Sequence, residues 1–164
     1  MEDISILAKK ARNGDTAAFA ELYSHVYEDM YRTALYNLRS EHDACDAVSE
    51  AVMDAFASIG KLKTEAAFRA WIMKILFAKI KQKQKEYFKQ GQELDENSSE
   101  SFDFENADLR EAINKLDDKS KAILSLSVLG GYSSFEIGRI YGMMPSAVRS
   151  RLTRIKQKLR LELT

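Results

Sequence analysis

The chain has 164 residues, 45% of them apolar, with seven glycines and one proline, which favours a helical core over a turn-rich β fold. Its apolar stretches are short and interrupted by charges, and its start, Met1-Glu2-Asp3, is acidic, so we expect neither a transmembrane helix nor a signal peptide. The single cysteine, Cys45, excludes an internal disulfide and predicts a protein of the reducing cytoplasm.

The net charge of zero is a cancellation between blocks of opposite sign. Residues 1–60 carry 5 Lys/Arg against 11 Asp/Glu, and residues 61–90 carry 9 against 2. Residues 91–118 then carry 2 against 10, and residues 119–164 carry 9 against 2. Such alternation indicates separate surfaces that meet partners of different sign, although a single block would ordinarily be only a solvated face.

The first ninety residues have the periodicity of four helices. A short one around residues 4–11 can end at Asn13-Gly14, and Asp15 or Thr16 can cap a second helix that reaches Leu38. A third runs from about Asp43 to Ile59, with Phe56 on its inward stripe, and ends at Gly60. The fourth begins near Thr64 and turns basic between Lys79 and Lys89, which predicts a face directed at a polyanion.

A linker and four further helices follow. Residues 91–108 hold seven acidic residues and no basic one, and we interpret them as a flexible tether between two domains. Helices are predicted at about 107–116 and 118–128. Ser133 and Glu136 then form a capping-box pattern that opens a short helix, and Pro145 suits the first position of a long final helix.

The short helix, glycine turn and long helix at the end of the chain form a helix-turn-helix pattern. From Arg139 to Arg160 there are seven basic residues and no acidic one. Arginine can pair two donors with guanine, and Ser or Thr can serve a base or a phosphate. The final helix is therefore a candidate DNA-reading element.

The motifs along the chain resemble those of bacterial RNA polymerase sigma factors of the extracytoplasmic-function (ECF) group. Residues 131–137 (GYSSFEI) and 146–152 (SAVRSRL) look like region 4 of that family, and residues 18–23, 43–50 and 68–72 look like its region 2. The resemblance covers nearly the whole chain except the linker. It implies an all-α fold of two small helical domains joined by a flexible acidic linker, the second domain being a helix-turn-helix.

The resemblance also implies a division of labour. Residues 1–90 would bind core RNA polymerase and the minus-ten promoter element, residues 91–106 would be the linker, and residues 107–164 would read the minus-thirty-five element. The polymerase-binding residues implied are Asp43, Asp46, Ser49 and Glu50. The DNA-binding residues implied are Lys63, Lys79, Lys83, Ser146, Arg149, Ser150, Arg151, Thr153, Arg154 and Lys158. Core polymerase and promoter DNA are the implied partners, and the existence of an anti-sigma factor is left open.

Three positions depart from the family pattern near the minus-ten site. Ala78 and Gln82 stand where the family commonly has Asn and Asp, and Leu62 stands where it often has an aromatic residue. Base capture at the minus-ten element is therefore less firmly implied than upstream reading.

Two other classes of function compete with this interpretation. A stand-alone helix-turn-helix regulator would bind DNA without polymerase but leaves the acidic helix around residues 43–54 unexplained. An enzyme is disfavoured because His25 and His42 stand alone, and no Cys/His cluster or glycine-rich phosphate loop occurs. We expect no metal, cofactor or catalytic residue.

Overall fold

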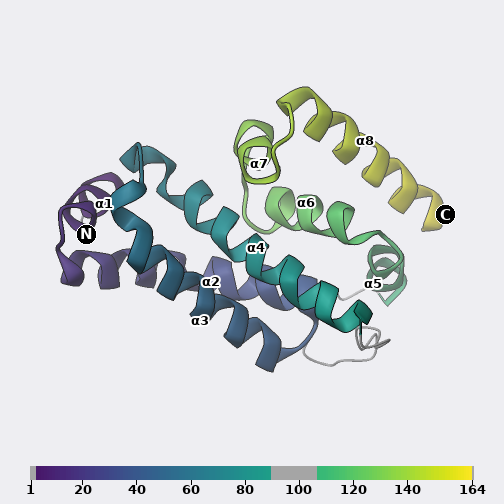
Figure 1. Cartoon of the computed structure of the whole chain (residues 1–164). Coiled ribbons are helices and arrows are strands. Elements are labelled where there is room, and N and C mark those ends of the chain that lie inside the picture. Colours follow the sequence, from purple (N-terminus) through teal and green to yellow (C-terminus); the bar gives the residue numbers. More distant parts are fainter. Residues whose placement is uncertain (1–2, 90–106, 164) are drawn as a thin grey trace.

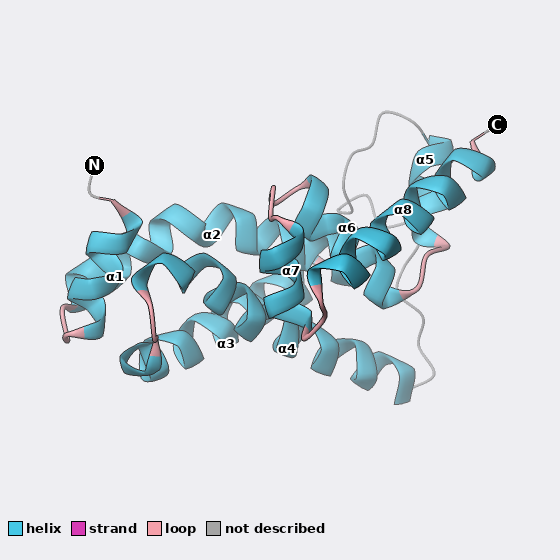
Figure 2. Cartoon of the chain, turned by 90° about the horizontal axis from the view of Figure 1, so that it is seen from above, coloured by secondary structure: helices cyan, strands magenta, loops and turns pink. Residues whose placement is uncertain are grey.

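The computed structural model describes residues 3–89 and 107–163, and within them every regular element is a helix (Figures 1 and 2). The first half of the chain contains α1 (Ile4–Arg12), α2 (Thr16–Leu38), α3 (Glu41–Ser58), two short 3₁₀ turns, η1 (Ile59–Lys61) and η2 (Glu65–Ala67), and α4 (Phe68–Lys89). The second half contains α5 (Ala107–Asn114), α6 (Asp118–Val128), α7 (Ser134–Tyr141) and α8 (Pro145–Glu162). The predicted all-α class is confirmed, and the predicted linker lies outside the described residues.

Side-chain caps set the helix starts much as the sequence predicts. Asp15 Oδ1 accepts a hydrogen bond from the Ala18 amide at 3.1 Å and begins α2. Ser133 and Glu136 form the full capping box of α7, with both hydrogen bonds at 3.1 Å. α3 begins at Glu41, two residues before the predicted Asp43, because Ser40 caps it. α4 begins at Phe68, four residues after the predicted Thr64, because the 3₁₀ turn η2 occupies Glu65–Ala67.

The first half is a helical hairpin with a third helix packed on it. α2 turns back into α3 through Arg39, which takes a left-handed conformation (φ 59°) and donates its amide to the Leu35 carbonyl at 2.7 Å. α4 crosses both helices and buries Phe68, Ile72 and Leu76 against them (Figure 1). Phe56, predicted to point inward, is 50% exposed and lies edge-on to Phe19 with ring centroids 5.1 Å apart, because small alanines fill the inner face of α3.

The second half packs α7 and α8 over α6 with a tight turn between them. Gly142 ends α7 in the left-handed conformation (φ 67°), and Pro145 opens α8. A side chain at Gly138 would overlap the carbonyl oxygen of Met143, so the chain returns directly over the end of α7. This turn sets the orientation of α8. Val148, Leu152 and Ile155 are buried, and the opposite face of the helix is exposed.

The two halves pack against each other, a contact that the sequence did not predict. α6 contacts α2 and α7 contacts α4. The second half lies alongside the first in both views (Figures 1 and 2). One continuous buried cluster includes Leu22 and Phe77 from the first half and Ile123 and Ile137 from the second. No helix within residues 3–89 or 107–163 is both long enough and apolar enough to cross a membrane.

Candidate nucleic-acid and polymerase interfaces

The exposed face of α8 carries four of the predicted DNA-binding residues. Ser146, Arg149, Ser150 and Thr153 are all exposed and lie opposite the buried Val148 and Leu152. Thr153 donates its hydroxyl proton to the Arg149 carbonyl at 3.0 Å, so its oxygen can still accept a hydrogen bond from a base or a water. No ion pair forms at Arg149 within the described residues, and its guanidinium can meet an acceptor in a groove.

Arg151, Arg154 and Lys158 lie on another side of α8. They line a cavity of about 170 Å³ against α6, together with Asp117 and Ser120. Arg151 Nη1 donates to Ser120 Oγ at 3.4 Å, while Asp117 Oδ1 accepts from the Ser120 amide at 2.7 Å. Hydrogen bonding from Ser120, followed by the positive charges of Arg151 and Lys158, holds the pKa of Asp117 below its usual value. The predicted set on α8 thus divides into two faces.

Two predicted DNA-binding lysines of α4 point toward α3. Lys79 Nζ lies 2.9 Å from Asp54 Oδ2, and Lys83 Nζ lies 3.9 Å from Asp46 Oδ2. Their side chains are only 23% and 14% exposed. The hydrogen bond to Asp54 raises the pKa of Lys79. In this arrangement neither lysine is directed at a phosphate backbone.

The exposed stripe of α4 consists of other residues. Lys81 and Lys85 are exposed, as are the two family departures Ala78 and Gln82. Lys81 and Lys85 line a cavity of about 500 Å³ with Phe88 and Lys89, closed from the other side by Lys119 and Tyr141. The sequence predicts one basic face over Lys79–Lys89, whereas the helix divides these lysines between two faces: Lys79 and Lys83 face α3, and Lys81 and Lys85 are exposed.

The predicted residue Lys63 lines a second cavity, of about 250 Å³, at the start of α4. Lys61, Thr64, Trp71 and Lys74 also line it, and Arg139 reaches it from α7. In a cavity of this kind the aromatic ring can stack on a base, and the surrounding cations can neutralise the phosphate of the same nucleotide. Trp71 is half-buried: it packs against the hydrophobic core and also lines this cavity.

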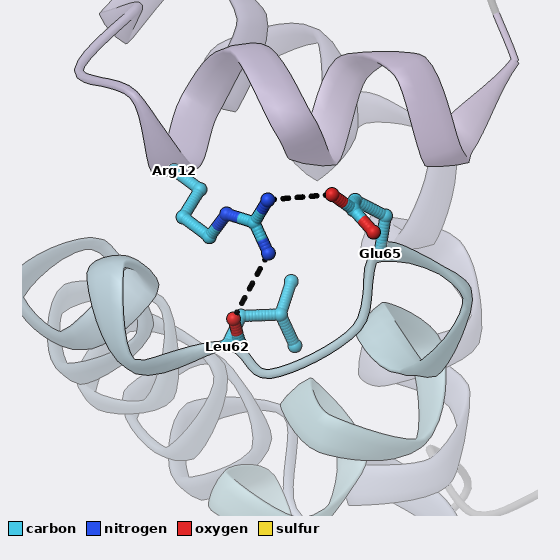
Figure 3. A network of polar contacts seen from close by, with 3 residues as sticks. All are labelled: Arg12, Leu62 and Glu65. Atoms are coloured by element: carbon cyan, nitrogen blue, oxygen red, sulfur yellow. Dashed lines mark hydrogen bonds and ion pairs between the residues drawn. The ribbon is translucent and has the colours of Figure 1, made fainter.

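The loop that carries Lys63 is held in place by α1. Arg12 Nη2 lies 2.6 Å from Glu65 Oε1, and Arg12 Nη1 donates to the Leu62 carbonyl at 3.3 Å (Figure 3). Backbone hydrogen bonding at Glu65, aided by the charge of Arg12, lowers the pKa of that carboxyl. Leu62, which stands where the family often has an aromatic residue, is buried but contributes to the lining of the same cavity.

α3 carries the four residues predicted to bind polymerase. Ser49 and Glu50 are exposed, and Asp43 and Asp46 are half-buried. An apolar residue that the sequence pattern does not single out lies next to them in the helix: the Met53 side chain is 71% exposed. Apolar anchors surrounded by charge are the usual make-up of a protein interface.

The side chains of His42, Asp43 and Asp46 offer ligand atoms within 4.8 Å of one another. His42 Nε2 lies 3.4 Å from Asp46 Oδ2, and Lys83 Nζ lies 3.9 Å from the same oxygen. Because the Asp46 carboxylate already lies beside the Lys83 ammonium group, and exposed acidic groups are common without an ion, we assign no metal to the cluster.

Known proteins resemble this chain along almost its full length. The family model described as Sigma-70 region 2 matches residues 22–87, and the model described as Sigma-70, region 4 matches residues 106–159. Among curated proteins, the RNA polymerase sigma factor SigV of Bacillus subtilis is 28% identical over 84% of this chain and 86% of its own length. The ECF RNA polymerase sigma factor SigW of the same organism is 24% identical over 94% of both chains.

Two solved structures share the fold. CnrH, in complex with the cytosolic domain of CnrY, superposes with a TM-score of 0.76 and 22% identity over 98% of this chain and 96% of that one. The sigma factor RpoE of Bartonella quintana, in complex with the anti-sigma factor NepR, superposes with a TM-score of 0.72 and 21% identity. The match covers 88% of this chain and 96% of that one.

Proposed function

The chain belongs to the sigma-70 family, in its extracytoplasmic-function group, and from this membership we infer how its surfaces divide the work of initiation. It is a sigma factor that directs core RNA polymerase to specific promoters and assists promoter melting, and it is not an enzyme. The alternative of a stand-alone regulator finds no support, because the region 2 model matches residues 22–87 alongside region 4.

We propose that α3 is the polymerase-binding helix, within a first domain of residues 1–90. Asp43, Asp46, Ser49 and Glu50 would meet a basic surface of the polymerase, and complementary charge would set the orientation and the association rate. The exposed Met53 would supply an apolar contact at the centre of the same interface.

We propose that the cavity at Lys63 takes a flipped-out base of the minus-ten element. A stacked base hides its edges, so a protein that reads it needs a pocket with an aromatic wall and nearby cations. Trp71 and Lys74 provide these, and Lys81 and Lys85 would follow the phosphates. The ion pairs of Lys79 and Lys83 favour a structural role for those two residues over the predicted DNA contact.

We propose that α8, in a second domain of residues 107–164, reads the upstream element. Ser146, Arg149, Ser150 and Thr153 would face base edges, since they share one exposed face near the helix start. Arg151, Arg154 and Lys158 would hold the phosphate backbone beside the start of α6.

A protein regulator is the remaining partner that we propose. RpoE of Bartonella quintana is bound to an anti-sigma factor, and CnrH is bound to a cytosolic domain, and both have this fold. We propose that an anti-sigma factor binds this chain as well, and that the chain acts in the cytoplasm with its polymerase.

The observation that carries the functional assignment is the presence of regions 2 and 4 in one chain, each with its own exposed charged helix. Run-off transcription with core polymerase tests the assignment, and a lack of promoter-dependent transcripts would overturn it. Within it, Asp46→Lys with Glu50→Lys should weaken core binding at least tenfold through charge reversal. Glu21→Lys with Glu28→Lys makes the same charge change on the exposed part of α2 and should leave core binding unchanged.

A further inference from the structure

The loop at residues 62–64 forms one wall of the cavity at Lys63. Lys63 and Thr64 are exposed and Leu62 is buried, and all three contribute to the lining. These residues connect the 3₁₀ turns η1 and η2 and belong to no helix themselves. Helical hydrogen bonding therefore does not hold this stretch, and its position depends on contacts from elsewhere in the chain.

The opposite wall of the cavity belongs to α4 and is held by the core. Ala70, Trp71 and Lys74 line it from the first two turns of that helix. Phe68 and Ile72, on the same turns, are fully buried. One wall is thus a helix anchored in the core and the other is a loop, so the width of the cavity depends on where the loop lies.

Arg12 contacts the loop at two points, one on each side of Lys63 and Thr64. Its Nη1 donates to the Leu62 carbonyl at 3.3 Å, and its Nη2 lies 2.6 Å from Glu65 Oε1 (Figure 3). Both nitrogens belong to one rigid, planar group, so the carbonyl and the carboxylate are held at a fixed spacing. This geometry holds both ends of the stretch that carries Lys63 and Thr64.

Arg12 is itself firmly placed. It is the last residue of α1, whose Leu7, Ala8 and Ala11 are buried, and α1 contacts both 3₁₀ turns. The side chains of Arg12 and Glu65 are only 27% and 29% exposed. A charge-assisted pair with this burial is less screened by water than an ion pair on an open surface. Arg12 is not among the residues that line the cavity, so it can influence a bound base only through the loop.

We propose that Arg12 is a positioning residue for promoter specificity: by holding the loop at Leu62 and Glu65, it sets the distance between Lys63 and Trp71 and so determines how strictly the cavity selects its base. The inference rests on the proposed function, which places a flipped-out base of the minus-ten element in this cavity. Selective binding needs the surrounding groups to be held within roughly 0.5 Å of the productive geometry. Without Arg12 the loop wall loses that support, while the wall on α4 keeps its own.

The test measures base selection position by position, with the full-length chain bound to core polymerase. Holoenzyme first selects its preferred sequence from DNA single strands that have a randomised central stretch. Each nucleotide of the preferred strand is then replaced in turn by an abasic site, and the loss of affinity is measured by fluorescence anisotropy. Trp71→Leu removes the ring and keeps apolar bulk, so the captured position is the one at which this variant no longer responds to the abasic site.

Arg12→Ala should reduce the loss of affinity at the captured position on the order of tenfold, which is the scale of one stacked base, and leave the losses at other positions unchanged. Arg12→Lys keeps a charge beside Glu65 but lacks the planar fork, so it should restore only part of the selectivity. Because Arg12 and Glu65 act as a pair, Arg12→Ala with Glu65→Ala should lose no more selectivity than the worse single variant. If Arg12→Ala fails to fold by circular dichroism, Arg12→Gln keeps most of the side chain and takes its place.

Two controls separate selectivity from stability. Asp15→Ala removes the cap of α2, which lowers the stability of the same half without touching the loop. Arg32→Ala removes an exposed arginine of α2. Both variants should keep the wild-type profile of losses along the strand.

Three results would each overturn the inference. They are an unchanged loss at the captured position in folded Arg12→Ala, a weakening spread evenly over all positions, and the same change of profile in Asp15→Ala. If Trp71→Leu altered no position, the proposed capture of a base would itself be wrong, and the role of Arg12 would fall with it. Run-off transcription by the wild-type chain is measured in parallel, so a failure of the sigma-factor assignment is detected separately.

Discussion

α4 and α8 are both long basic helices, yet they present their charge differently. On α4, Lys79 and Lys83 pair with carboxylates of α3, and Lys81 lies over the ring of Tyr141. On α8, Arg149 points away from the rest of the molecule, on a face that nothing in the described structure covers. Positive charge counted along a sequence is therefore not the same as positive charge available to DNA.

The difference follows from how each helix is supported. α4 crosses the centre of the molecule and has neighbours on several sides, so Lys79, Lys81 and Lys83 have partners within the protein. α8 packs on α5, α6 and α7 through the side that carries Val148, Leu152 and Ile155, and its face with Ser146, Arg149, Ser150 and Thr153 is exposed.

The largest effect should come from the turn that aims α8. Gly138→Ala would force a methyl group against the Met143 carbonyl, and overpacking of this kind costs about 1–3 kcal/mol. We expect the free energy of unfolding, measured in urea, to fall by an amount at the upper end of that range. Gly60→Ala is the matched control, because a methyl group there meets nothing within 4 Å. Equal stability of the two variants would show that the turn can relax.

The two faces of α8 should differ in what they contribute to DNA binding. Arg149→Ala should narrow the gap in affinity between the cognate upstream element and a scrambled one by about 2 kcal/mol, since a bidentate base contact contributes about 1–3 kcal/mol. Lys158→Ala should weaken both DNAs alike and lower the salt slope by about one. These affinities are measured by fluorescence anisotropy across a salt series.

Lys79→Ala provides the counterpart on α4. Because its partner is Asp54, its removal should change single-strand affinity much less than Arg149→Ala changes upstream discrimination. If Lys79→Ala lowered the free energy of single-strand binding as much as Arg149→Ala lowers upstream discrimination, the ion pair of Lys79 would not keep that residue from DNA, and the contrast between α4 and α8 would be wrong.

The smallest effect should be a pH-dependent loss at the start of α6. The folded-state pKa of Asp117 lies below its unfolded value, so its carboxylate stabilises the fold above about pH 4 and loses that effect as the pH falls through the folded pKa. Asp117→Ala should cost about 1 kcal/mol at pH 7, as is typical for a lost N-cap, and this cost should shrink below pH 4. Asp117→Asn keeps a capping oxygen and should cost less at neutral pH. A cost for Asp117→Ala that stayed constant with pH would contradict the role of the charged form.

The sequence predicts the local structure of this chain well because local signals depend on neighbours. The capping box at Ser133, the cap at Asp15 and the helix-turn-helix before Arg149 each depend on residues a few positions apart, and the structure confirms them. The two-faced character of α4 could not be predicted in this way. Periodicity separates the apolar face of a helix from its polar face, but it does not identify which carboxylate lies opposite Lys79 or Lys83.

The packing of the halves was missed for the same reason. Tyr132 and Tyr141 look like ordinary residues of a short helix and its approach, and their partners lie about sixty residues away on α4. The tether suggested independent domains, since a flexible linker does not reveal whether its ends pack together. Phe56 was misplaced because alanines, which carry little weight in an apolar pattern, fill the inner face of α3.

The pairing of Arg12 with the loop at Leu62 and Glu65 has a consequence for building chimaeric sigma factors. A hybrid that took its region 2 from this chain starting at α2 would leave the loop beside Lys63 without the side chain that holds it. Exchange of minus-ten specificity between two sigma factors should therefore transfer α1 together with α4, although more than fifty residues separate Arg12 from the start of α4. The smallest portable unit of this half is the whole of α1–α4.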